Sequence, residues 1–211
     1  MLKPDIKFKT IDLTHTVTVS MPTHSYDEPM SLKKIRELSA HHYTDYQLTT
    51  GMHVGTHIDG PAHMLDVTTS IANIPLDRFV GRGYLVDARG HAVIDAPLLD
   101  TMPAQHDLIV LVLTGSDKQW GSAGYFQNHP VITEAFAQQL IDRKVKMLGI
   151  DMFSPDAYPF AVHKLLLAND ILIAENLTNL DQLVGAKDFT VAALPLKIQA
   201  DSAPARVVVF N

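Results

Sequence analysis

Apolar and polar residues alternate along the early part of the chain, between Thr10 and Ser20. Every second position from Ile11 to Val19 is apolar except His15, and the positions between them are threonine or aspartate. A period of two residues predicts a half-buried strand. We expect His15 to face inward in this strand, at the edge of the core or of a site.

Later segments also have strand character. Residues 108–113 read LIVLVL, and such a continuous apolar run is typical of a strand that is covered on both faces. Further strands are expected at residues 46–49, 83–88, 145–151, 170–175, 189–193 and 206–210.

Helices are expected at residues 31–40, 133–144, 159–168 and, in shorter form, 179–184. Thr133 can cap the second of these, along which Phe136 and Leu140 are spaced to face inward. The last predicted strands and helices include one βαβ succession, at residues 145–175. The pattern therefore predicts an α/β fold, and the length of 211 residues predicts one domain over residues 1–211.

One segment, GMHVGTHIDGPAHMLD at residues 51–66, contains most of the candidate chemistry. It places three histidines and an aspartate between His53 and His63. Three β-branched residues, a central glycine and a closing Gly-Pro pair disfavour a helix and predict extended chain that runs into a turn. In an extended segment His53, His57 and Asp59 share one face.

Two imidazoles and one carboxylate on one face form half of a metal site. Without thiolates, these ligands suit zinc, manganese or iron(II), and an incomplete protein shell leaves positions open for water and substrate. The pattern therefore favours a catalytic metal site over a structural one. His63, just past the turn, is either a further ligand or a general acid and base.

Composition narrows the possible partners. The chain is 46% hydrophobic and 19% charged, and its net charge of −6 argues against a nucleic-acid partner. The absence of cysteine excludes disulfides and a cysteine nucleophile and fits an intracellular protein. The first residues contain no apolar run of signal-peptide length and no segment approaches a membrane span, so we expect a cytoplasmic protein without a membrane partner.

The string His53-x-Gly55-Thr56-His57-x-Asp59-x-Pro61-x-His63 resembles the signature of the metal-dependent cyclase family, which includes bacterial kynurenine formamidases and isatin hydrolases. The similarity extends in weaker form from about Thr10 to the end of the chain. It implies a single α/β domain with a mixed, barrel-like β-sheet and few flanking helices, of the swivelling β/β/α kind. It also implies a homo-oligomer, either a dimer or a tetramer.

The resemblance further implies which residues bind metal. His53, His57, Asp59 and Glu175 would hold one divalent ion, and Asp59, His163 and Glu175 a second. Zinc is the expected metal, with two ions, and a single manganese ion is the alternative. Two cations at about 3.5–4 Å need shared anionic oxygens to offset their repulsion, which the two carboxylates would supply. His63 is assigned to proton transfer.

The implied activity is hydrolysis of a small-molecule, non-peptide amide by metal-activated water. The formamide of an N-formyl arylamine, as in an arylformamidase, is the first choice of substrate, and a cyclic amide of the isatin kind is the second. A non-catalytic metal- or ligand-binding protein on the same scaffold is the alternative from another functional class.

Two loops are candidates for the substrate side of the site. The loop between Pro22 and Pro29 resembles the family's early loop, although it carries His24-Ser25-Tyr26-Asp27 where formamidases usually have tryptophan and a Pro-Gly-Asp step. Trp120 lies in a glycine-rich loop after the 108–113 strand. This tryptophan either covers the substrate or anchors its loop to the core.

The segment IDMFSPD, which ends the 145–151 strand, matches a family segment. Asp151 is placed there for hydrogen bonding to a metal ligand. Ser154 and Asp156 are instead assigned to turn formation and helix capping, which serine and aspartate commonly perform.

Overall fold

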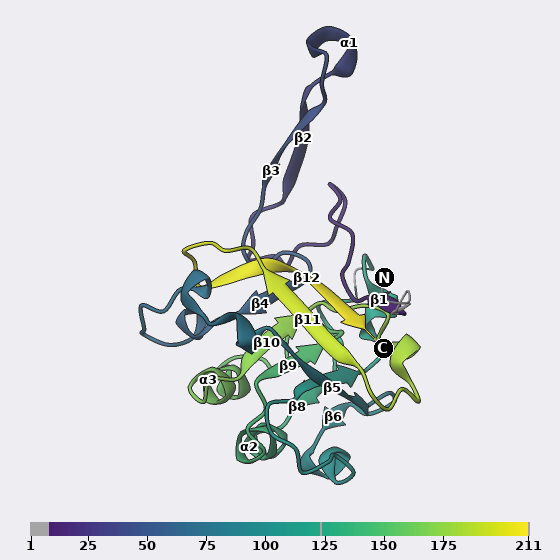
Figure 1. Cartoon of the computed structure of the whole chain (residues 1–211), viewed down its shortest axis with the longest axis vertical. Helices are drawn as coiled ribbons and strands as arrows, with labels where there is room; N and C mark the ends of the chain where they lie inside the picture. Colours follow the sequence, from purple (N-terminus) through teal and green to yellow (C-terminus); the bar gives the residue numbers. More distant parts are fainter. Residues whose placement is uncertain (1–8, 123, 211) are drawn as a thin grey trace, which may run out of the picture.

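A closed ring of seven strands forms the centre of the computed structural model, which describes residues 9–122 and 124–210 (Figure 1). The order around the ring is β12, β11, β5, β7, β9, β10 and β4, and β4 pairs back with β12. The bounds are β4 (His57–Asp59), β5 (Val80–Asp87), β7 (Ile109–Leu113), β9 (Met147–Ile150), β10 (Leu172–Glu175), β11 (Thr190–Pro195) and β12 (Ser202–Phe210). Strands β5, β7, β9 and β10 are parallel and the others antiparallel, so the expected mixed, barrel-like sheet is confirmed.

Strand β7 shows why the LIVLVL run is continuously apolar. Ile109, Leu111 and Leu113 pack in the core cluster inside the ring, whereas Val110 and Val112 pack in a second cluster beneath the helices. All five residues are buried. Two apolar layers therefore cover this strand, as the sequence predicts.

Few helices flank the ring, and they lie on one side of it (Figure 1). These are α2 (Glu134–Asp142) and α3 (Ala161–Leu167), close to the predicted ranges, and Thr133 caps α2 by accepting a hydrogen bond from the Phe136 amide. No helix among the described residues has the length and apolarity needed to cross a membrane. The remaining helical turns are η1 (Pro61–His63), η2 (Ile71–Asn73), η3 (Leu76–Arg78), η4 (Ala96–Leu99), η5 (Ser116–Gln119) and η6 (Leu180–Leu183), and the short strands β6 (Val93–Ile94) and β8 (Val131–Ile132) pair with each other.

The helix predicted at residues 31–40 is wrong over most of its length. Residues 31–36 form strand β2 (Ser31–Arg36), which pairs antiparallel with β3 (Asp45–Thr49) in a hairpin arm that projects from the ring (Figure 1). Only α1 (Leu38–His41) at the tip of the arm is helical. The residues favour a helix locally, but their backbone N–H and C=O groups form hydrogen bonds with β3 instead. Local propensity does not predict such a pairing between separate segments.

The strand predicted at residues 10–20 is shorter than expected. Strand β1 (Thr10–Asp12) pairs with β12, and the alternation continues only to Leu13, which is buried like Ile11. Val17 and Val19 are exposed, so their inward placement is wrong. His15 lies between these two regions and stacks on Trp120, with ring centroids 4.0 Å apart.

Gly83 in β5 allows Phe189 to pack against the strand. A Cβ at this position would lie 2.0 Å from Phe189 Cε2, and Phe189 is 4% exposed within the core of the ring. We expect Gly83→Ala to lower the free energy of unfolding by about 1–3 kcal/mol, because the phenyl ring must move within a close-packed core. Urea denaturation measures this loss. Gly124→Ala is the control, since its Cβ would have no neighbour closer than 3.7 Å; equal stability of both variants would contradict the expectation.

Candidate active site

The histidine-rich segment reaches the site through a turn and not through a single extended strand. Only His57–Asp59 is strand, and Gly55 has φ of +74°, a left-handed conformation that glycine adopts without strain. A Cβ on Gly55 would also lie 2.5 Å from Met21 Cε. The predicted shared face of one strand is therefore wrong, but the turn still brings ligand atoms of His53, His57 and Asp59 within 4.8 Å of one another.

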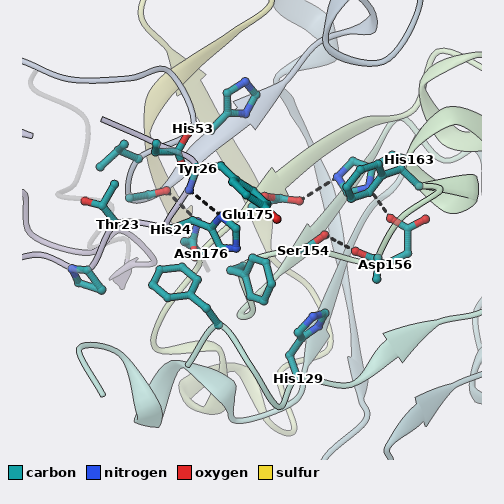
Figure 2. Close-up of a pocket in the computed structure, with 18 of the residues that line it drawn as sticks. Thr23, His24, Tyr26, His53, His129, Ser154, Asp156, His163, Glu175 and Asn176 are labelled. Atoms are coloured by element: carbon teal, nitrogen blue, oxygen red, sulfur yellow. Dashed lines mark hydrogen bonds and ion pairs between the residues drawn. The ribbon is translucent and has the colours of Figure 1, made fainter. Parts of the chain in front are cut away.

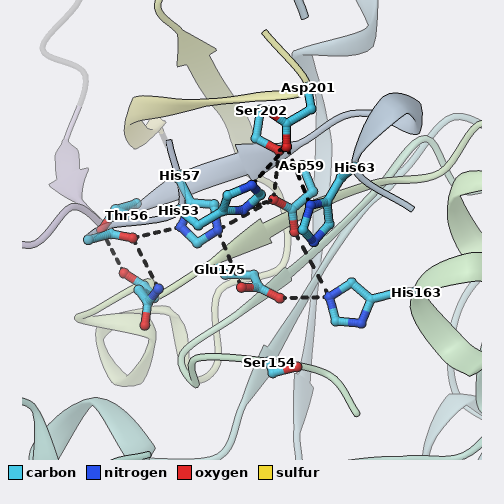
Figure 3. Close-up of polar contacts among 12 residues, drawn as sticks. His53, Thr56, His57, Asp59, His63, Ser154, His163, Glu175, Asp201 and Ser202 are labelled. Atoms are coloured by element: carbon cyan, nitrogen blue, oxygen red, sulfur yellow. Dashed lines mark hydrogen bonds and ion pairs between the residues drawn. The ribbon is translucent and has the colours of Figure 1, made fainter. Parts of the chain in front are cut away.

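His57 is held in one orientation by the backbone of this turn. Its Nδ1 lies 2.8 Å from the Gly55 carbonyl oxygen, which also accepts a hydrogen bond from Asn176 Nδ2. A carbonyl only accepts, so Nδ1 carries a proton, and in the neutral imidazole Nε2 has the lone pair. Figure 3 shows that Nε2 points at two carboxylates, 3.4 Å from both Asp59 Oδ1 and Glu175 Oε2.

His163 is oriented in the same way from the other side of the site. Helix α3 carries it, and its Nδ1 hydrogen-bonds to Asp156 Oδ1, while Asp156 Oδ2 accepts from the Val162 amide. His163 Nε2 then lies 3.2 Å from Glu175 Oε1 and 4.0 Å from Asp59 Oδ2. Both buried histidines thus direct Nε2 toward the same pair of carboxylates.

In the IDMFSPD segment, Asp156 has the role that the sequence assigned to Asp151. Asp156 caps the start of α3 as expected, but it also holds His163, which its assignment to capping and turn formation omitted. Asp151 instead accepts hydrogen bonds from the amides of Thr114 and Gly115, and among the described residues it hydrogen-bonds to no imidazole. Ser154 forms the predicted turn through a 2.6 Å bond to the Asp156 carbonyl. Asp156 precedes His163 by seven residues, and sequence spacing alone does not predict a contact at that separation.

The two carboxylates each face both histidines. Asp59 directs Oδ1 toward His57 and also toward His53, whose Nδ1 is 3.0 Å away, and directs Oδ2 toward His163. Glu175 directs Oε2 toward His57 and Oε1 toward His163. Asp59 is 0% exposed and Glu175 5%. Each carboxylate therefore lies between imidazole nitrogens on two sides.

His53 and His63 share a partner that the sequence did not indicate, Asp201. Asp201 Oδ2 lies 2.8 Å from His53 Nε2 and 3.4 Å from His63 Nδ1, and the two imidazoles lie side by side with centroids 4.1 Å apart (Figure 3). The neighbouring Ser202 donates a hydrogen bond to Asp59 Oδ1. Asp201 lies near the end of the chain, and no spacing rule connects it to a histidine 148 positions earlier.

Charge balance shows what the site requires. Burial opposes protonation of His57, but Asp59 and Glu175 outweigh it and raise the pKa of His57 well above its usual value. Burial likewise opposes the ionised form of Asp59, yet His57 and His53 hold the pKa of this carboxyl well below its usual range. For His63 burial dominates and lowers its pKa. The buried carboxylates therefore need nearby positive charge, from protons on the imidazoles or from a bound cation.

The donor set fits a divalent cation. His57 Nε2 and Asp59 Oδ2 are buried and have no hydrogen-bond partner among the described residues, although both point into the cluster. Nitrogen and carboxylate oxygen donors without sulfur suit zinc, manganese or iron(II). Two further groups, Asp59 with His63 and His163, and His53 with His63 and Asp201, also have ligand atoms within 4.8 Å of one another. The described residues therefore offer overlapping sets of donors for a divalent cation.

A cavity of about 470 Å³ opens onto this cluster (Figure 2). The expected substrate-side loop contributes Pro22, Thr23, His24, Tyr26 and Asp27 to its lining. Trp120 also lines the cavity while it stacks on His15, so it both faces the cavity and anchors its loop. The size is in the range of small-molecule sites.

Comparisons with known proteins identify the family of this chain. Residues 11–157 match the family described as "Putative cyclase". The chain is similar to an uncharacterized protein of Methanocaldococcus jannaschii (36% identity, covering 77% of this chain and 80% of the relative) and to the kynurenine formamidase of Delftia acidovorans (31%, 76% and 77%). Isatin hydrolase A from Ralstonia solanacearum has a similar structure, with a TM-score of 0.86 and 25% identity over 96% of this chain and 92% of that protein.

Proposed function

The chain belongs to the Cyclase family, and its relatives include a kynurenine formamidase and an isatin hydrolase. From this premise we propose that it is a metal-dependent hydrolase that cleaves the formamide of an N-formyl arylamine. The observation that carries this proposal is the pair of buried carboxylates, Asp59 and Glu175, each directed at imidazole nitrogens on two sides. The relation to kynurenine formamidases and the aromatic lining of the cavity support an arylformamide.

We place one divalent ion, zinc by preference, among His53, His57, Asp59 and Glu175, and a second among Asp59, His163 and Glu175. When bound there, the ions supply a water nucleophile at neutral pH and polarise the amide carbonyl. The protein orients the ligands through the Gly55 carbonyl and Asp156, which keep both Nε2 lone pairs directed inward. A single manganese ion in the same cluster is the alternative occupancy.

His63 moves the proton in this proposal. It lines the cavity next to the cluster, and its Nδ1 faces Asp201, so the imidazole is held with its other nitrogen free. The water oxygen joins the formyl carbon, the C–N bond breaks, and the amide nitrogen receives the proton that the water lost. The products are formate and the arylamine, and without a proton the amine is a poor leaving group.

A cyclic aryl amide of the isatin kind is the second candidate substrate. The specific support is the likeness to isatin hydrolase A over nearly the whole of both chains. Opening a lactam ring requires the same water, carbonyl polarisation and protonated nitrogen. The cavity is large enough for a bicyclic ring system.

The test is a hydrolysis screen combined with metal analysis. Purified protein is stripped with a chelator, reloaded separately with zinc and manganese, and assayed with formanilide, isatin and a simple aliphatic lactam. We expect formanilide hydrolysis that requires an added ion and is fastest among the three. If the reloaded protein binds metal stoichiometrically but cleaves none of them, the chain is a non-catalytic metal-binding protein and the proposed function is wrong.

Self-association into a dimer or tetramer is also part of this proposal. The hairpin arm supports it, because the arm exposes several large apolar side chains, Ile35, Leu38, Tyr43, Tyr46 and Leu48. Clustered exposed apolar residues commonly mark interaction surfaces.

A further inference from the structure

One wall of the cavity is aromatic. Phe153 is at its centre and contacts Phe126 edge-to-face at 5.3 Å and His129 at 4.4 Å between ring centroids. Phe160 extends this wall to His163, 5.8 Å away. The rings are only partly buried, so they present apolar faces to whatever enters. Such a wall suits the ring of an aryl amide.

The segment from Pro22 to Asp27 closes the cavity on another side. His24 stacks on Phe153 with centroids 5.6 Å apart and an interplanar angle of 16°, which joins the segment to the aromatic wall. Asp27 lies three residues after His24, and its amide donates a hydrogen bond to the His24 carbonyl. An aromatic ring held on this wall therefore lies near the loop that carries Asp27.

The cavity lining contains carboxylates and imidazoles but no other cationic side chain among the described residues. None of the residues that line it is lysine or arginine, and the carboxylates are Asp27, Asp156 and Glu175. Asp156 and Glu175 are committed to imidazoles. The Asp27 carboxylate has no side-chain partner in the described part of the chain, so it is the uncommitted carboxylate of the lining.

We propose that this cavity selects amides whose aryl ring carries no negative charge on the side remote from the amide, and that Asp27 enforces this selection. The inference rests on the proposed amide hydrolysis and narrows its substrate class. A carboxylate at the far end of the ring, away from the metal cluster, would lose hydration against Phe153 and Phe126 and would meet no lysine or arginine side chain of the described lining. It would also face the like charge of Asp27.

A matched pair of substrates tests the proposal. 4-Formamidophenylacetate and 4-formamidophenylacetamide have nearly the same shape and differ in charge, and the methylene group insulates the leaving arylamine from the electronic difference. At pH 8, where histidines of ordinary pKa are neutral, we expect kcat/KM of the metal-loaded protein to be roughly 100-fold higher for the acetamide. Values equal within about threefold would overturn the proposal.

A charge reversal identifies the residue responsible. In Asp27→Lys we expect the preference for the acetamide to fall to about tenfold or less, chiefly through a lower KM for the acetate. Glu28→Lys makes the same change of charge one residue away, at an exposed position outside the cavity lining, and should keep the original preference. If both variants shift the preference equally, the selection comes from overall charge and the role of Asp27 is wrong.

Failure of the proposed function has a different outcome. If the metal-loaded protein does not cleave formanilide or either test compound, amide hydrolysis is wrong. The two intact compounds are then titrated into the same protein by calorimetry. Binding of the acetamide that is at least roughly tenfold tighter supports the selection against negative charge, and equal affinity overturns it.

Discussion

Replacement of Glu175 by glutamine is expected to lower kcat/KM by roughly 1000-fold, equivalent to about 4 kcal/mol, and to remove bound metal. Glu175 directs one oxygen at His57 and the other at His163. Glutamine preserves the shape but keeps only one oxygen and adds an NH₂ group that repels a cation. The site therefore loses both a negative charge and the second bridging donor.

Metal content and thermal stability measure this effect separately from activity. Metal binding to the folded state raises the free energy of unfolding by about 2.7 kcal/mol when the metal concentration is 100 times the Kd. For a chain of this length that is roughly 5–11 °C in Tm. We expect added zinc to raise the Tm of the unmodified protein by such an amount and to leave the Tm of Glu175→Gln nearly unchanged, with little metal retained on dialysis.

Asp151→Asn is the matched control for loss of a buried carboxylate. Asp151 is 0% exposed like Asp59, but its oxygens accept from Thr114 and Gly115 and face no imidazole. Its replacement should reduce stability while the folded protein keeps its metal and its kcat. A Glu175→Gln protein with full metal content and full activity would contradict the two-ion arrangement.

Replacement of His63 by alanine is expected to lower kcat by about 100- to 10,000-fold while metal content stays normal. His63 faces Asp201 and lines the cavity, whereas the three other histidines of the cluster lie against Asp59, Glu175 or both. Loss of His63 should therefore slow proton transfer and leave metal binding unchanged. If His63→Ala instead loses metal, His63 is a ligand, which is the other reading of its position in the motif.

The dependence on leaving group distinguishes proton transfer from a general loss of structure. A proton donor matters most for a strongly basic amine, so His63→Ala should lose more activity with 4-methoxyformanilide than with 4-nitroformanilide. His129→Asn is the control, because it changes another histidine of the cavity that contacts Phe153 on the aromatic wall. It should affect KM more than kcat. Equal losses for both substrates in His63→Ala would contradict the assigned role.

The sequence was sufficient to predict the residues of the cluster, but not the residues that hydrogen-bond to its histidines. His53, His57 and Asp59 lie within seven residues, and resemblance to the family indicated His163 and Glu175, all of which the structure brings together. Asp201 was missed because its contact with His53 spans most of the chain. Contacts of this kind depend on which strands become neighbours, here β4 and β12, and a single sequence contains no local signal for that pairing.

The chain's own pattern determined the strands of the ring, helices α2 and α3, and the ligand types of the site, because periodicity and side-chain chemistry are local properties. Only the tertiary structure decided that residues 31–36 are strand and not helix, that Asp156 and not Asp151 holds a histidine, and that Asp59 and Glu175 each face two sides. The placement of Asp59 and Glu175 arises from closure of the ring, which makes β4 pair with both β10 and β12. Residues 31–36 are strand because β2 pairs with β3 outside the ring. Backbone pairing between distant segments satisfies hydrogen bonds regardless of local propensity, and so it settles what the local pattern leaves open.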